Sequence, residues 1–158
     1  MKKIFFRLSS LLIVILFACN NDSGGDTTGA DKDPLKAEAD SLREEVMNGH
    51  NIAMPKSMRI PDLKKVTTRL LDSIAKLPVK AQKATAPYKA KLDSLFKNLD
   101  YAEMVMDKWM NEYNDTLFQN NLEQRIKYLA EEKMKVEVVK EKVLGSLAKA
   151  DSLLKAKL

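Results

Sequence analysis

The fold is decided by residues 118–156, which read FQNNLEQRIKYLAEEKMKVEVVKEKVLGSLAKADSLLKA. No proline interrupts this stretch, and its apolar residues return every three or four positions. The members of this stripe are Leu122, Ile126, Leu129, Val136, Val143, Leu147, Ala150 and Leu154. Such spacing places them on one face of an α-helix. The stretch therefore predicts a helix about 58 Å long whose apolar face packs against other helices.

Two earlier stretches, residues 34–77 and 80–113, show the same periodicity. In the first, Asp33 is a good N-cap and Pro34 suits the first helical position. Its apolar positions are Leu35, Ala39, Leu42, Val46, Gly49, Ala53, Leu63, Val66, Leu70, Ile74 and Leu77. The apolar positions of the second stretch are Tyr88, Leu92, Leu95, Leu99, Met106, Met110 and Tyr113. Each stretch predicts one further helical pass along the molecule.

Prolines mark where these passes bend or turn. Pro55 and Pro61 interrupt the first pass, because a proline removes a backbone hydrogen bond and clashes with the preceding turn. Pro78 and Pro87 bracket a turn region between the first and second passes. Asn114 and Asp115 break the second pass, and we expect Asp115 to cap the third.

The fold class that follows is all-α, because no stretch alternates with period two for long enough to form a sheet. We expect an elongated antiparallel helical bundle of three passes, with its first helix kinked or broken near Pro55–Pro61. The alternative is a four-helix bundle in which this proline pair makes a true turn.

Composition excludes several kinds of function. The 158 residues contain one Cys and one His, which excludes a disulfide framework, a Cys-based zinc site and every HExxH-type site. There is no glycine-rich phosphate loop and no convincing nucleophile with a base beside it. We therefore expect that the protein is not an enzyme.

The N-terminal residues are typical of an exported protein. Lys2, Lys3 and Arg7 accompany an apolar run over residues 8–17, which is shorter than the roughly 20 residues that a membrane-spanning helix needs. The run ends in LFAC at residues 16–19, which resembles the bacterial lipobox. The alternative is an uncleaved membrane anchor.

The lipobox resemblance implies cleavage before Cys19 and attachment of lipid to that residue. We therefore expect a signal peptide over residues 1–18, a lipidated Cys19 with a flexible tether over residues 19–33, and a helical bundle domain over residues 34–158. The tether contains no bulky apolar residue, so it cannot bury enough surface to offset chain entropy. The expected location is a bacterial cell-envelope membrane, with the domain in the periplasm or at the cell surface.

The net charge of +5 overstates how basic the mature chain would be. Residues 1–18 hold three of the 27 basic residues and no acidic one, so 24 basic and 22 acidic residues remain, a net charge of +2. A nearly neutral chain argues against a nucleic-acid partner.

Methionines gather around the only His and the only Trp of the chain. Met47, Met54 and Met58 flank His50, and Met104, Met106 and Met110 flank Trp109. If the first two passes form a hairpin, residues whose numbers sum to roughly 164 face each other. This register places Met54 level with Met110 and Met58 level with Met106, so the two clusters should meet.

Thioether sulfur and neutral imidazole are ligands that suit Cu(I) and Ag(I). One hypothesis is therefore a soft-metal site formed by His50, Met54, Met106 and Met110, with Trp109 as a shield. Met47, Met58 and Met104 would be reserve ligands. The competing interpretation is that these residues only fill the core, as methionines at helical spacing usually do. The chain would then be a structural or adaptor bundle that contacts an envelope protein, whereas the metal hypothesis implies a metal-delivery partner.

The segments HNIAMPKSM at residues 50–58 and MDKWM at residues 106–110, behind a lipobox, resemble a group of small helical lipoproteins of Bacteroidota-type bacteria. Members of this group often carry the label "viral A-type inclusion protein". The resemblance implies an exported, lipid-anchored helical protein and implies no established activity. Members tend to have an acidic residue after the His, where this chain has Asn51.

Overall fold

The computed structural model describes residues 33–155, and within this range the chain is helical and contains no strand. Four helices follow each other: α1 (Pro34–Ser57), α2 (Ile60–Ala75), α3 (Val79–Glu112) and α4 (Leu122–Lys155). The predicted all-α fold is therefore confirmed. The predicted signal peptide and the tether with Cys19 lie outside the described residues, apart from Asp33.

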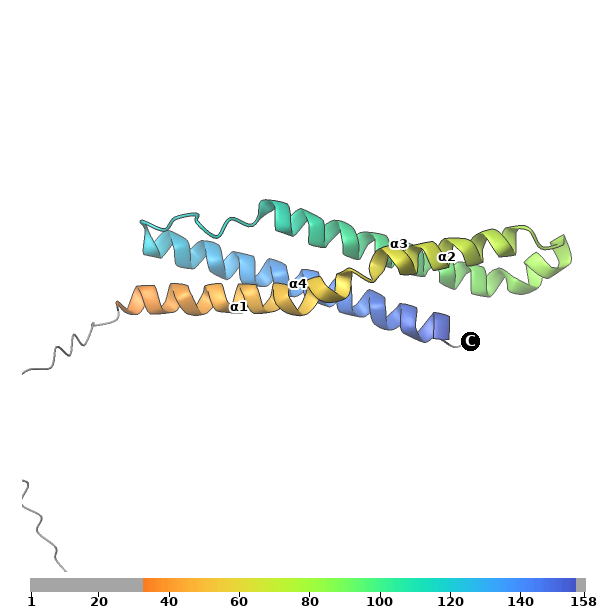
Figure 1. Ribbon diagram of the computed structural model, residues 1–158, viewed down its shortest axis with the longest axis horizontal. Helices are drawn as coiled ribbons and strands as arrows, with labels where there is room; N and C mark the ends of the chain where they lie inside the picture. The colour runs from red at the N-terminus through yellow and green to blue at the C-terminus, as the bar shows by residue number, and fades with distance from the viewer. Residues whose placement is uncertain (1–32, 156–158) are drawn as a thin grey trace, which may run out of the picture. The chain divides into compact units, whose positions relative to one another are not determined.

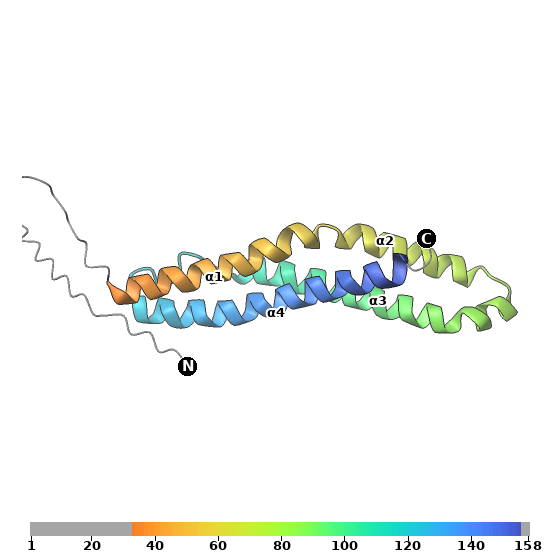
Figure 2. The same ribbon diagram turned by 90° about the horizontal axis from the view of Figure 1, so that it is seen from below.

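The helices form an elongated bundle of three passes, as the sequence predicts (Figure 1). Helices α1 and α2 together make the first pass, α3 returns along it, and α4 runs parallel to α1 (Figures 1 and 2). An ion pair joins Glu45 of α1 to Lys133 of α4. Lys64 of α2 lies 2.6 Å from Asp100 of α3, and these two residue numbers sum to 164, as the hairpin register predicts.

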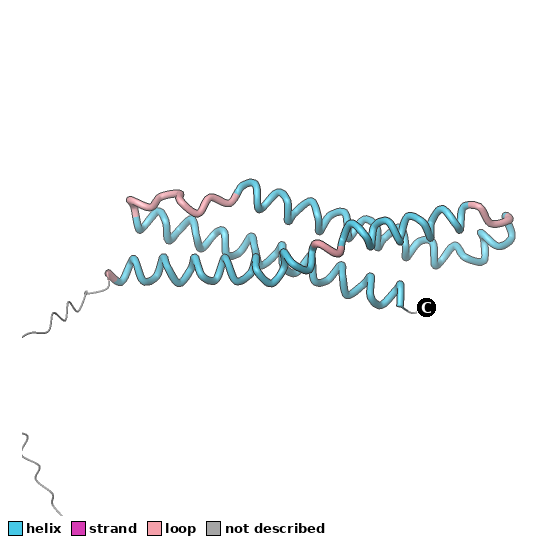
Figure 3. The backbone as a smooth tube through the Cα atoms, in the orientation of Figure 1, coloured by secondary structure: helices cyan, strands magenta, loops and turns pink. Residues whose placement is uncertain are grey.

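The first pass bends by 39° between α1 and α2, at the short loop visible in Figure 3. Pro55 lies inside α1 and cannot donate to the carbonyl four residues earlier, and Pro61 lies in the first turn of α2. The Ser57 hydroxyl donates to the Met54 carbonyl at 2.8 Å, close to the bend. Because α2 continues in the direction of α1, the predicted kink is confirmed and the alternative four-helix bundle is wrong.

Two helix boundaries differ from the sequence-based expectation. Pro87 lies inside α3, where we expected a turn region. Asp115 does not cap the third pass, because α4 begins only at Leu122 and Asn121 accepts the hydrogen bond from the Gln124 backbone at 3.1 Å. Asp115 is instead engaged by an arginine of α1, Arg43.

The core runs along the inside of the three passes and is mostly aliphatic. Its buried members come from every helix and are Val46, Ala53, Ile60, Leu95, Leu99, Ala102, Met106, Trp109, Val136, Val139, Val143, Leu147 and Ala150. Helix α1 approaches α4 closely at Gly49, where an added Cβ would lie 2.9 Å from Cγ1 of Val136. None of the helices described over residues 33–155 combines the length and the apolar character needed to cross a membrane.

Candidate functional site

The structure brings His50 of α1 and Trp109 of α3 together. Their ring centroids lie 5.6 Å apart, with 33° between the ring planes. Met54 follows His50 by one helical turn, and Met106 precedes Trp109 by one turn, so each methionine shares a helix face with one of the rings. Met54 packs against the core cluster that contains both Met106 and Trp109. The two stretches therefore meet at His50 and Trp109, and Met54 and Met106 each lie one helical turn from one of these rings.

The other methionines occupy different environments. Met110 is 37% exposed and is not among the residues that pack against the core cluster. Met47 is half-buried. Met58 and Met104 are 72% and 51% exposed, so these two expected reserve ligands lie mostly in solvent. The bend beside Met58 explains why the hairpin register, which fits α2 and α3, does not bring Met58 onto buried Met106.

The imidazole of His50 has a polar neighbour on its own helix. Its Nδ1 atom lies 3.2 Å from Oδ1 of Asn51. In the tautomer that carries its proton on Nδ1, the ring donates to Asn51 and keeps the lone pair of Nε2 as a potential ligand. Asn51 can thus orient the ring in the way that an acidic residue at this position would.

Trp109 is held in place by a buried carboxylate. Its Nε1 atom donates to Oε2 of Glu132 on α4 at 2.9 Å. Glu132 is only 3% exposed, and its other oxygen accepts a hydrogen bond from Lys135 at 2.7 Å. This hydrogen bond raises the pKa of Lys135. The carboxylate therefore fixes the indole ring while the ammonium group neutralises the buried charge.

An aromatic column continues from Trp109 toward the loop between α3 and α4. Trp109 stacks on Tyr113 at 4.9 Å between centroids, and Tyr113 stacks on Tyr128 of α4 at 6.3 Å. Phe118 meets Tyr128 edge to face at 6.2 Å. Aromatic pairs at such separations contribute beyond the apolar area that they bury. The column links the candidate site to this end of the bundle.

Asp115 ties the loop to both outer passes. Its two oxygens accept hydrogen bonds from Arg43 of α1, each at 2.7 Å, and one of them also accepts from the Tyr113 hydroxyl at 3.0 Å. Arg125 of α4 donates to the Asp115 and Leu117 carbonyls. The hydrogen bond from Arg43 is the main reason why the pKa of Asp115 is lowered. Burial and the hydrogen bond to Asp115 raise the pKa of Tyr113.

Sequence analysis does not single out Glu132, because this residue lies in a run of charged side chains, Glu131-Glu132-Lys133. A usable signal existed. Glu132 lies three residues after Leu129 and four before Val136, so it occupies the apolar stripe of α4. A carboxylate at such a position predicts a buried partner, which the structure shows to be Trp109.

The donors that gather at the site are one imidazole and thioether sulfurs. Within residues 33–155 no three His, Cys, Asp or Glu side chains form a group that could hold a metal ion. Comparisons of the chain with protein-family models, with curated proteins and with solved structures find no match.

Proposed function

We propose that the protein is a lipid-anchored protein of the bacterial cell envelope that binds a soft metal ion, Cu(I) or Ag(I). The observation that carries the metal proposal is the packing of His50 on Trp109, with Met54 and Met106 on the same core cluster. Lipid attachment through Cys19 rests on the lipobox pattern of residues 16–19.

Each residue of the site has a separate role in this proposal. The imidazole of His50 offers a nitrogen ligand, and half-buried Met54 and the more exposed Met110 offer sulfur that an ion can reach from solvent. Met106 offers sulfur from the core side, because it is only 1% exposed. Trp109 covers the site, and Glu132 fixes its ring.

A second candidate function is that of a structural or adaptor bundle that contacts another envelope protein and binds no metal. The observation that favours it is the burial of Met106 and Trp109 in the core, where both contribute to packing whether or not a metal binds. The two functions differ in what a methionine-to-leucine change does, because leucine preserves packing and removes sulfur.

The test is a titration of residues 32–158 with Ag(I), and with Cu(I) under anaerobic conditions. This segment is a compact unit by itself. Trp109 is the only tryptophan, so its fluorescence reports directly on events at the site. We expect saturable quenching in the parent protein, and at least a tenfold loss of affinity in M106L/M110L. Each methionine-to-leucine change nearly conserves side-chain volume, so each should lower the free energy of unfolding by less than about 1.5 kcal/mol.

The matched control is M104L/M134L, which removes two sulfurs that are 51% and 65% exposed and lie outside the buried core cluster; Met104, expected from the sequence as a reserve ligand, lies mostly in solvent. This variant should bind the metal like the parent. Unchanged affinity in M106L/M110L, with circular dichroism showing an intact fold, would refute the metal site and leave the adaptor function.

A further inference from the structure

The short loop between α2 and α3 places two apolar side chains in solvent. Leu77 is 37% exposed, and Val79, the first residue of α3, is 69% exposed, with Pro78 between them. This loop forms the tip of the α2–α3 hairpin, which extends beyond the last turn of α4 (Figures 1 and 3). Isolated apolar residues at a surface are ordinary, but these two lie together at the extreme end of an elongated bundle.

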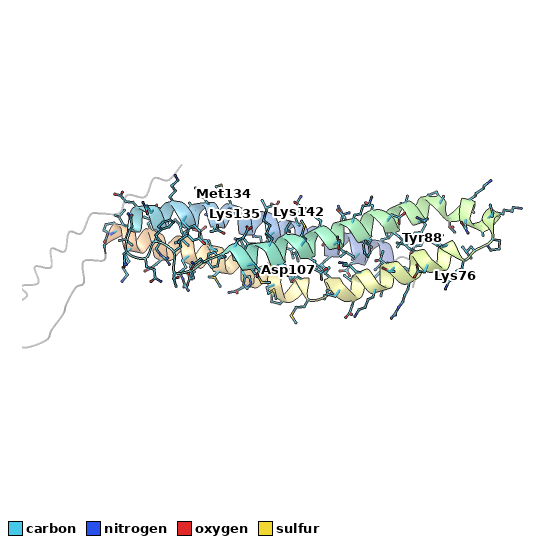
Figure 4. All side chains as sticks on the ribbon, turned by 90° about the horizontal axis from the view of Figure 1, so that it is seen from above. Lys76, Tyr88, Asp107, Met134, Lys135 and Lys142 are labelled. Carbon is cyan, nitrogen blue, oxygen red and sulfur yellow. The ribbon has the colours of Figure 1, made fainter. Side chains whose placement is uncertain are left out.

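Lysines surround this apolar tip. Lys76, Lys80 and Lys83 are exposed, and no ion pair joins any of them to another residue in the described part of the chain. Figure 4 shows Lys76 at this end of the hairpin, far from Met134 and Lys135 on α4. Residues 64–97 contain nine basic and two acidic residues, a net charge of +7. Residues 98–121 contain one basic and five acidic residues, a net charge of −4, so positive charge is concentrated toward the tip.

Three backbone carbonyls at the tip are paired within the protein. The side-chain amide of Gln82 donates to the Ala75 carbonyl at 3.0 Å and to the Leu77 carbonyl at 2.7 Å. The Pro78 carbonyl accepts from the backbone N–H groups of Ala81 and Gln82. Because these three carbonyls are paired within the protein, moving the loop out of water would leave fewer polar groups unpaired.

We propose that this tip binds the surface of an anionic phospholipid membrane. Leu77 and Val79 enter the boundary between headgroups and acyl chains, and Lys76, Lys80 and Lys83 contact the lipid phosphates. The apolar pair is what selects a membrane over a soluble polyanion, because a soluble polyanion offers nothing for it to enter. This inference goes beyond metal binding and depends on none of the residues of the metal site.

The tip lies at the end of the bundle opposite to Pro34, where the chain enters the described domain (Figure 2).

The experiment is sedimentation of residues 32–158 with vesicles, one set made of equal parts phosphatidylglycerol and phosphatidylcholine and the other of phosphatidylcholine alone. This unit contains the whole described core, so it is expected to fold without the preceding residues. We expect binding to the anionic vesicles that weakens as salt is raised, and at least tenfold weaker binding to the neutral ones.

Two variants of the tip separate the electrostatic contribution of its lysines to membrane binding from the apolar contribution of Leu77 and Val79. K76Q/K80Q/K83Q should weaken binding to the anionic vesicles by roughly 100-fold, because each lysine near an anionic surface contributes substantially. L77S/V79S should weaken it by roughly tenfold, also at high salt, because the lost contribution is apolar.

Matched controls change similar residues away from the tip. K127Q/K142Q removes two exposed lysines of α4, and M134S/V138S removes two apolar side chains of α4 that are 65% and 50% exposed. Both should bind the anionic vesicles within about twofold of the parent. Circular dichroism of every variant confirms that the bundle is intact.

Equal binding to neutral and anionic vesicles, or no binding to either, would overturn the proposal. Loss of binding in the lysine variant with unchanged binding in L77S/V79S would also overturn it, because the tip would then be a site for polyanions in general. An equal loss in tip and control variants would show that total charge or apolar surface matters and not the tip.

Discussion

The two connections between the passes lie at opposite ends of the bundle and are built differently. The loop from Tyr113 to Asn121 is long, and Asp115, Arg43 and Arg125 tie it to both outer passes. The hairpin tip around Pro78 is short, and a single side chain, Gln82, satisfies two of its carbonyls. The long loop adjoins the aromatic column and the candidate metal site, whereas the tip leaves apolar and basic groups in solvent. The polar and aromatic side chains described at the long-loop end thus bind each other, whereas apolar and basic side chains at the hairpin tip remain exposed to solvent.

The largest contrast between the two ends should come from alanine substitutions. Trp109→Ala removes the buried end of the aromatic column and leaves a cavity, so it should lower the free energy of unfolding by about 3–5 kcal/mol. Leu77→Ala, at the exposed tip, should change it by less than about 0.5 kcal/mol. Urea denaturation followed by circular dichroism measures both values. Similar losses at the two positions would show that the ends do not differ in this way.

The sequence predicts the helical passes well because periodicity is a local signal. The stripe of residues 118–156 and the capping pair Asp33 and Pro34 depend only on neighbours within a few positions. The expectation that Asp115 caps the third pass was wrong, because α4 begins six residues later than such a cap requires. The Asp115 carboxylate instead binds a long-range partner, Arg43 on α1, which no local pattern encodes. The turn expected to end at Pro87 was wrong, because α3 continues through this proline. Just before it, the Thr85 hydroxyl donates to the Ala81 carbonyl.

The candidate site was only partly predictable for a related reason. Residue spacing predicts that Met54 shares a face with His50, since both lie on one helix. The same spacing cannot show that Glu132 of α4 binds Trp109, because nothing local encodes that pairing. It also cannot show that the 39° bend leaves Met58 exposed.

The two glycines of the helices sharpen the contrast between packed and open surfaces. Gly49→Ala places a Cβ 2.9 Å from Cγ1 of Val136, a buried and stiff side chain, and should lower the free energy of unfolding by about 1 kcal/mol despite the better helix propensity of alanine. Gly145→Ala meets nothing within 4 Å and should raise it by about 0.5–1 kcal/mol. The same denaturation measurement gives both signs. A gain at Gly49 equal to that at Gly145 would contradict the close approach of α1 to α4.

The smallest expected effect concerns pH at the long loop. The pKa of Asp115 is lowered in the folded state, chiefly by the hydrogen bond from Arg43, while the unfolded value is about 3.9. Its contribution to stability is therefore present above that unfolded value and is lost as pH falls through the lower folded pKa. Parent and Asp115→Asn should differ at pH 7 by less than about 1 kcal/mol, because the pair is partly exposed, and the difference should shrink as pH falls through the lowered folded pKa. If the free energies of unfolding of parent and variant still differ by the same amount at low pH, the charge of Asp115 does not contribute to stability.

Silver titration of residues 32–158, monitored by Trp109 fluorescence, tests the central claim most directly. We expect saturable quenching in the parent and in M104L/M134L, and at least a tenfold weaker affinity in M106L/M110L with the fold intact. Equal quenching in all three proteins would contradict it, because the sulfurs beside Trp109 would then have no part in binding.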